Sequence, residues 1–242
     1  MSLQILAAVA LVVAVAAFVQ GTTGLGFALI TAPVIGIVDP GLLPVVLLAL
    51  MIPLNVYVAW RERGRVDRGG VGWITVGRLA GTLGGLWVLL AVPPDRLALL
   101  IGASTVVAAL VALAAPAFRP GRGAFLVAGA VTGVTETSTG IGGPPLALVY
   151  QHEPAPVLRS TVAVCFVVGE VISLGLLGAT GKADAEQFRA ALVLLPALAL
   201  GALLSRWVHH RLDGRLMRLI VLIFAVASGV VVMIPQFAPG SI

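Results

Sequence analysis

Long apolar segments separated by short polar ones make up most of this sequence. Six segments are uninterrupted, and each is close to the roughly 20 residues that a helix needs to cross about 30 Å of hydrocarbon. They are residues 41–60, 71–91, 95–115, 157–179, 187–207 and 214–234. Two further segments, 3–38 and 123–152, are interrupted by clusters of Gly, Thr and Pro. The pattern predicts an all-α polytopic membrane protein with two broken segments, each a re-entrant hairpin or a pair of short spans.

Composition excludes the other broad classes. Of the 242 residues 60% are hydrophobic and 10% are charged, whereas soluble proteins have about 45–50% and 25%. A disordered chain needs low hydrophobicity, and a membrane β-barrel needs short alternating segments. The single Cys165 excludes a disulfide framework and a Cys-rich metal site. No spacing of His, Asp or Glu indicates a metal, no nucleophile is evident, and we expect neither a cofactor nor an enzyme.

The two halves of the chain resemble each other. Residues Thr23-Gly-Leu-Gly26 align with Thr139-Gly-Ile-Gly142 at an offset of 116, and Gly81 and Trp87 align with Gly201 and Trp207 at an offset of 120. Similarities in the same order predict two repeats, 1–118 and 119–242. Each repeat then consists of a broken hairpin (3–38 or 123–152) followed by three membrane helices. A hairpin returns the chain to the side on which it entered, and three crossings then bring it to the opposite side. The second repeat is therefore inverted relative to the first.

The positions of the basic residues test this topology, because cytoplasmic loops are rich in Lys and Arg. With the N-terminus outside, the cytoplasmic side receives twelve of the fifteen basic residues. These are Arg61, Arg63, Arg65, Arg68, Arg78, Arg119, Arg122, Arg159, Arg206, Arg211, Arg215 and Arg218. If each broken segment crossed once, the division would be nine to six. The basic pI of about 10.6 therefore reflects orientation in a lipid bilayer, and we expect no nucleic acid as a partner.

The breaks have the chemistry of an anion site. Bare backbone is tolerated at membrane depth only where it lines a cavity, and glycine lets a ligand approach it. Pro144 and Pro145 suit the first turn of a helix, whose free N–H groups and partial positive charge favour an anion. The alternative is that these small residues only let helices pack closely. The candidate substrate-binding residues are Gln20, Thr22, Thr23, Gly24, Gly26, Thr137, Ser138, Thr139, Gly140, Gly142 and Gly143.

Gln20-Gly-Thr-Thr-Gly-Leu-Gly-Phe27 with Pro33, and Gly133 through Gly142-Gly-Pro-Pro145, resemble the TauE/SafE family of sulfite and organosulfonate exporters, also called the toluenesulfonate uptake permease group. The resemblance covers nearly the whole chain as two repeats. It implies an inner-membrane carrier of small sulfur-containing or other organic anions. The family often carries a glycine after Gly-x-Gly; Gly143 fits this pattern, and Phe27 departs from it.

Ionisable and polar residues inside apolar segments are candidates for coupling or gating. Glu136 lies in the second break, where it carries a proton or serves as a helix-terminal hydrogen-bond acceptor. Glu170 lies near the middle of segment 157–179, where a bond to a neighbouring helix is the alternative. Arg78 binds the anion, pairs with a Glu or extends to the cytoplasmic surface. Asn55 and Tyr57 complete this set, near the cytoplasmic end of segment 41–60.

The sequence thus predicts a secondary transporter that moves a small anion across the inner membrane by alternating access. The anion is sulfite, an organosulfonate or a related organic anion, and a proton or sodium ion is the expected coupling ion. A passive anion channel, a non-transporting membrane subunit and an intramembrane enzyme are the alternatives. Which anion is carried, in which direction, and whether the chain forms a homo-oligomer stay open.

Overall fold

The computed structural model describes residues 3–93, 96–114, 119–151, 153–208 and 214–234. These residues form ten α-helices and one short 3-10 helix, η1, and contain no strand. The elements are α1 (Leu3–Thr23), α2 (Phe27–Val38), η1 (Pro40–Leu42), α3 (Val45–Arg61), α4 (Arg68–Ala91), α5 (Leu97–Ala114), α6 (Arg122–Thr139), α7 (Gly143–Tyr150), α8 (Ala155–Ala179), α9 (Ala185–Val208) and α10 (Gly214–Met233). The predicted all-helical class is confirmed.

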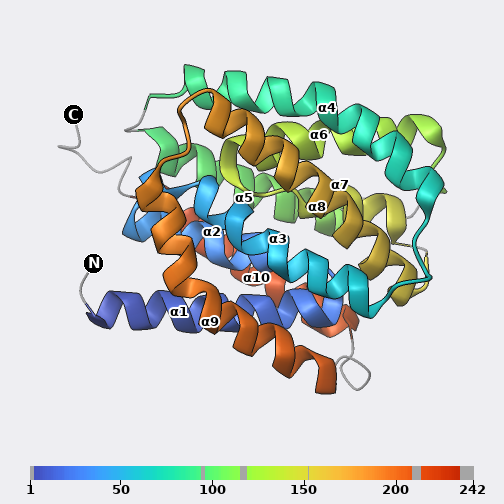
Figure 1. The fold of residues 1–242 in the computed structure, drawn as a ribbon, viewed down its shortest axis with the longest axis horizontal. Coiled ribbons are helices and arrows are strands. Elements are labelled where there is room, and N and C mark those ends of the chain that lie inside the picture. Colours follow the sequence, from blue (N-terminus) through green and yellow to red (C-terminus); the bar gives the residue numbers. More distant parts are fainter. Residues whose placement is uncertain (1–2, 94–95, 115–118, 152, 209–213, 235–242) are drawn as a thin grey trace.

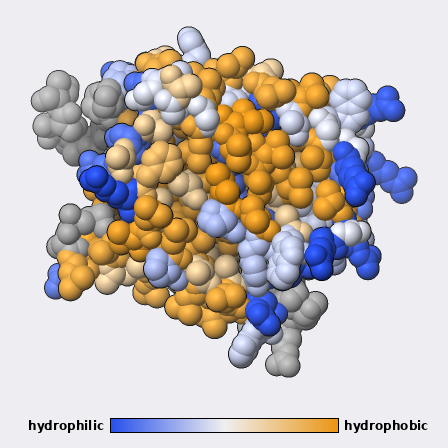
Figure 2. Space-filling view, viewed as in Figure 1, coloured by the Kyte–Doolittle hydropathy of each residue, from blue (hydrophilic) through white to orange (hydrophobic). Residues whose placement is uncertain are grey.

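The surface is that of a multi-pass membrane protein. Five of the described helices (α1, α4, α5, α8 and α9) are long and apolar enough to cross a membrane. Large hydrophobic side chains such as Leu83, Trp87 and Leu192 are more than 60% exposed, which only lipid makes favourable over so wide an area. Figure 2 shows hydrophobic residues across the middle of one face and hydrophilic residues at its two ends.

Both predicted breaks interrupt helices as expected. α1 ends at Thr23 and α2 begins at Phe27, while α6 ends at Thr139 and α7 begins at Gly143. In each case the second helix folds back and packs against the first. Gly24 (φ 85°), Gly26 (φ 113°) and Gly140 (φ 81°) adopt left-handed backbone conformations, which residues with a Cβ rarely adopt. Glycine at these positions is therefore what allows the helices to stop and reverse.

Among the helix starts that differ from the sequence prediction, two have clear local reasons. The segment predicted to start at residue 41 begins as a helix only at Val45, because Pro40–Leu42 form η1 and Pro44 precedes the helix. The segment predicted from residue 71 begins three residues earlier, at Arg68. There the Asp67 carboxylate accepts a hydrogen bond from Gly70 N at 3.0 Å and caps the helix.

The helices form a bundle with two close pairs at its edges. α4 packs along α6, α1 packs along α9, and α3 and α8 lie between these pairs (Figure 1). The close pairs depend on glycine. A Cβ on Gly81 of α4 would overlap the backbone carbonyl of Ala130 on α6, and a Cβ on Gly201 of α9 would overlap that of Ala14 on α1. Backbones can approach this closely only where side chains are missing.

Replacing Gly81 with Ala is expected to lower the free energy of unfolding by about 1–3 kcal/mol, because the added methyl must push α4 away from α6. Gly72→Ala is the matched control, since it lies in the same helix and its Cβ would meet no atom within 4 Å. Thermal unfolding in detergent measures both variants. Equal melting temperatures for the two would contradict the role given to the close contact.

Candidate functional site

The first break forms one wall of a cavity. Thr22 and Thr23 end α1, and both hydroxyls donate to the carbonyl oxygen of Val19, at 2.8 and 2.9 Å. The Thr23 hydroxyl also lies 2.6 Å from the carbonyl oxygen of Leu25 and accepts from Leu25 N at 3.2 Å. These bonds close the break into a compact turn, and they leave Thr22 and Thr23 on the cavity wall.

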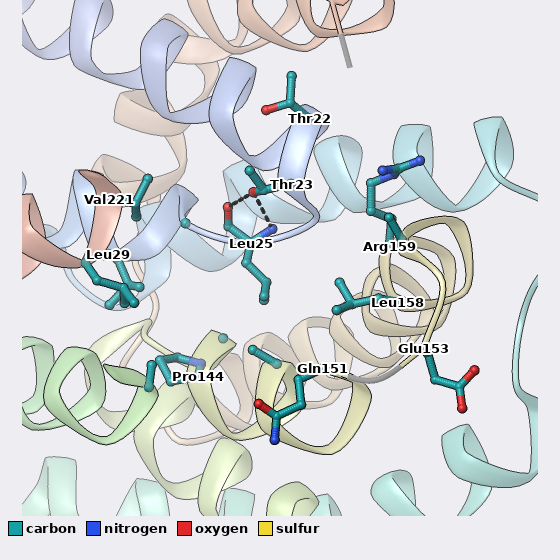
Figure 3. Close-up of a pocket in the computed structure, with 16 residues that line it drawn as sticks. Thr22, Thr23, Leu25, Leu29, Pro144, Gln151, Glu153, Leu158, Arg159 and Val221 are labelled. Atoms are coloured by element: carbon teal, nitrogen blue, oxygen red, sulfur yellow. Dashed lines mark hydrogen bonds between the residues drawn. The ribbon is translucent and has the colours of Figure 1, made fainter. Parts of the chain in front are cut away.

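The cavity has a volume of about 310 Å³ and lies between the two breaks. Thr23 and Leu25 approach it from the first break, and Pro144 and Gln151 from the α7 side (Figure 3). Apart from Thr22, Thr23, Gln151, Glu153 and Arg159, the lining is largely apolar. It comprises Thr22, Thr23, Leu25, Gly26, Leu29, Ala112, Gly143, Pro144, Ala147, Gln151, Glu153, Ala155, Leu158, Arg159, Val221 and Leu222.

Arg159 is the cation of this cavity, and sequence reasoning placed it only among the cytoplasmic arginines. It lies in the second turn of α8, and its side chain is 8% exposed. α8 reaches the first break because residue 24 is glycine: a Cβ there would lie 2.8 Å from Cγ and 3.1 Å from Cα of Arg159. The signal in the sequence is an arginine a few residues inside the apolar segment that follows the second broken segment, 123–152.

The predicted site residues divide into two groups. Thr22, Thr23, Gly26 and Gly143 line the cavity. Gly24 is not part of the lining but lies against Arg159, which is. Gln20 and the remaining residues of the second break lie outside the lining. A Cβ on Gly140 would overlap the side chain of Leu47 on α3, and the positive φ of residue 140 would strain any residue other than glycine.

The hydroxyls of the second break are engaged within the protein. Ser138 and Thr139 donate to carbonyls of their own helix, at 2.8 Å to Val134 and 2.7 Å to Thr135. The Thr137 hydroxyl lies 2.8 Å from that of Ser173 on α8. These bonds satisfy groups that have no water to bind at this depth. The predicted role of these three residues in substrate binding stays a prediction.

A second group of polar side chains lies buried behind the first break. Phe27 N donates to Gln20 Oε1 at 3.1 Å, Gln20 Nε2 donates to Asn55 Oδ1 at 3.0 Å, and Asn55 Nδ2 donates to Glu170 Oε1 at 2.7 Å. The backbone donor at Phe27 fixes the direction of the row, because each amide must then turn its NH2 group to the next oxygen. The row joins the start of α2 to the middle of α8.

Arg78 and Glu136 form an ion pair beside this row, and both are fully buried. Arg78 Nη1 also donates to the carbonyl oxygen of Cys165 at 3.3 Å. A Cβ on Gly169 would overlap the guanidinium, so this glycine gives Arg78 its space against α8. The sequence left three roles open for Arg78: to bind the anion, to pair with a Glu, or to extend to the cytoplasmic surface. In the structure Arg78 pairs with Glu136 and does not extend to the surface.

The cluster of Gln20, Asn55, Arg78, Glu136 and Glu170, which we name the buried polar cluster, holds two carboxyl groups and one guanidinium. Glu170 Oε2 has no hydrogen-bond partner among the described residues. If both carboxyls were ionised, the cluster would carry one uncompensated negative charge where desolvation is costly. One bound proton makes it neutral, so the cluster is chemically suited to exchange a proton.

Tyr57, the remaining gating candidate, lies in the last part of α3. The Arg61 guanidinium stacks over its ring at 5.5 Å. Among the described residues there is no group of three or more His, Cys, Asp or Glu side chains that could hold a metal ion.

Comparison with known families decides the identity of the chain at family level. The family model described as Sulfite exporter TauE/SafE matches residues 9–232. The chain belongs to the TauE/SafE family. No curated protein and no solved structure matches it at a significant level. Membership supports a membrane transporter of sulfur-containing anions, and the match spans both breaks, the cavity and the buried polar cluster.

Proposed function

We propose that this TauE/SafE member is a secondary transporter that binds a small oxyanion in the cavity between its two breaks. The observation that carries the proposal is the lining of this cavity, which has Thr22, Thr23 and Arg159 on mostly apolar walls. Guanidinium donors suit the oxygens of a sulfite, sulfonate or carboxylate. A threonine hydroxyl adds a donor when its hydrogen turns from the Val19 carbonyl, where it points in this structure, toward the anion. The apolar walls favour an anion with a small organic part over a fully hydrated one.

Alternating access between two inverted repeats is the mechanism we propose. The contacts between helices support it. By their order in the two repeats, α1 corresponds to α6, α3 to α8 and α4 to α9. Each contact then has a counterpart: α4 packs on α6 as α9 packs on α1, and α3 packs on α9 as α8 packs on α4. The contact of Gly81 with Ala130 has its counterpart in that of Gly201 with Ala14, at the offsets found in the sequence. Two structurally related halves around one site provide a way to open it to either side in turn.

We place the arginine-rich end of the bundle in the cytoplasm and the N-terminus outside. The end of α3 and the start of α8 meet there through the ion pair of Glu62 with Arg159. At the opposite end, where α9 begins, Gln187 Nε2 donates to the carbonyl oxygen of Gly41 at 2.8 Å. This grouping of loops supports the predicted charge asymmetry. The inner membrane is the location we propose.

For coupling we propose the buried polar cluster, with Glu170 as the group that gains and loses a proton. Oε1 of Glu170 accepts from Asn55, so Oε2 is the oxygen left to carry the proton. The row through Asn55 and Gln20 ends at the start of α2. A change of charge at Glu170 therefore alters hydrogen bonds that hold the first break, beside the proposed anion site.

Thr23→Val is expected to reduce uptake of labelled sulfite or of a competing organosulfonate into proteoliposomes by about tenfold or more, because it removes a polar group of the cavity lining together with the hydrogen bonds that close the first break. Thr180→Val is the matched control. Its hydroxyl also donates to a carbonyl of its own helix, at 2.8 Å to Leu176, but it is exposed at the far end of α8. Equal uptake by both variants would remove the first break from the site, and the same assay on Thr139→Val tests the second break.

Glu170→Gln is expected to abolish accumulation driven by a pH gradient while leaving exchange of anions at equal pH. The amide keeps the acceptor for Asn55 and removes the titrating group. One-for-one coupling to protons gives about tenfold accumulation per pH unit in the wild type, and the variant should stop near a ratio of one. Glu186→Gln, on the exposed first turn of α9, is the control. Accumulation by Glu170→Gln equal to wild type, or accumulation that follows only a sodium gradient, would contradict proton coupling at this residue.

A further inference from the structure

The cavity arginine is held by a carboxylate of the protein itself. Arg159 Nε and Nη2 lie 3.0 and 2.9 Å from the same oxygen, Oε1, of Glu62. Glu62 follows directly on the last residue of α3. In Figure 3 the guanidinium of Arg159 and the carboxylate of Glu153, both belonging to the cavity lining, point in different directions. Arg159 thus contributes its stem to the wall while its charge is turned toward Glu62.

We propose that Glu62 is an internal substitute for the transported anion: it occupies Arg159 when the cavity is empty, and the anion displaces it on binding. The inference rests on the proposed function and adds to it the pair of residues that recognises the anion. A carboxylate and a sulfite, sulfonate or carboxylate substrate present the same kind of oxygen acceptor to a guanidinium. Occupant and substrate are therefore chemically exchangeable at Arg159.

The geometry favours displacement over a permanent bond. Both contacts go to one oxygen of Glu62, so the pair lacks the two parallel bonds that make arginine–carboxylate pairs strongest. The Glu62 side chain is 12% exposed, and it lies at the end of the bundle rather than at its centre. A guanidinium carries five N–H donors on three nitrogens, so an anion can begin to bind before Glu62 has left.

Displaced Glu62 would still have a counter-charge. Arg61 Nη2 lies 3.6 Å from the same Oε1. The Glu62 carboxylate therefore keeps a positive charge beside it after the anion has taken its place on Arg159. This matters because breaking a buried pair is costly mainly through the charge left behind. Arg61 Nη2 also donates to the carbonyl oxygen of Gly21 at 2.5 Å, and Arg61 Nη1 to the Ser205 hydroxyl at 3.2 Å. The exchange therefore takes place next to contacts that join α3 to α1 and α9.

The first test is a gain of apparent affinity in Glu62→Gln, measured as KM for labelled sulfite or organosulfonate uptake in proteoliposomes. Removing the internal competitor is expected to lower KM about fivefold or more, within the usual range of such couplings. A variant that folds poorly cannot mimic this result. Glu153→Gln removes an equal charge from the cavity lining and leaves the Glu62–Arg159 pair in place. An unchanged or raised KM in Glu62→Gln, or an equal decrease in Glu153→Gln, would overturn the proposal.

The second test exchanges the two charges in the double variant Glu62→Arg/Arg159→Glu. If the pair only stabilises the fold, the exchanged pair restores transport lost in Arg159→Glu alone. The proposal instead requires that transport stays at least tenfold below wild type although the melting temperature recovers, because the cavity then carries a carboxylate. Restored transport would overturn it.

Failure of this inference is distinguishable from failure of the proposed function. Saturable uptake by the wild type is the common starting point, and its absence would refute the transporter itself. With wild-type uptake in hand, the KM of Glu62→Gln and the transport of the exchanged pair report only on Arg159 and Glu62.

Discussion

Hydrocarbon offers no hydrogen-bond partner, and this one constraint shapes the whole molecule. A polar group inside the bundle is costly unless it finds a partner within the protein. The hydroxyls of Thr22, Ser138 and Thr139 donate to carbonyls near their own helix ends, and Arg78 pairs with Glu136. Where the chain departs from helix, at Gly24–Gly26 and Gly140–Gly142, it does so inside the protein rather than against lipid. The cavity lies between these two departures, and residues of both line it.

The same constraint explains why the cavity and the buried polar cluster are adjacent. Gln20 bonds to the start of α2 on one side and to Asn55 on the other. Its neighbours Thr22 and Thr23 face the cavity. In the proposed mechanism, a proton on Glu170 and an anion beside Thr23 thus act on the same turn. Coupling in this account needs no long pathway, because the two events share the hydrogen bonds of one break.

Periodicity and composition were sufficient to predict the helices and both breaks. Gly, Thr and Pro clusters interrupt otherwise apolar runs, and these residues have strong local preferences. The sequence also identified Asn55, Arg78, Glu136 and Glu170 individually, since a polar side chain in an apolar run is costly. It could not show that they converge. Asn55 and Glu170 are 115 residues apart, and only packing of α3 on α8 brings them into contact.

Arg159 was harder to predict as a site residue because an arginine near a helix start has a sufficient explanation in membrane orientation. Its approach to the first break depends on Gly24, which accommodates its Cα and Cγ. Conversely, the hydroxyls of Thr137, Ser138 and Thr139 looked available in the sequence, and in the fold they bond to neighbouring helices or to their own backbone. Residue type predicts a chemistry for each break, whereas helix packing determines which residues line the cavity.

Counterflow tests the central claim most directly. Proteoliposomes preloaded with unlabelled sulfite or organosulfonate are diluted into a trace of the labelled anion, with no pH or sodium gradient. A carrier with one alternately exposed site predicts a transient overshoot, in which the internal label rises above the external concentration and then decays. A monotonic approach to equal concentrations, as a passive channel gives, would contradict alternating access through the cavity between the two breaks.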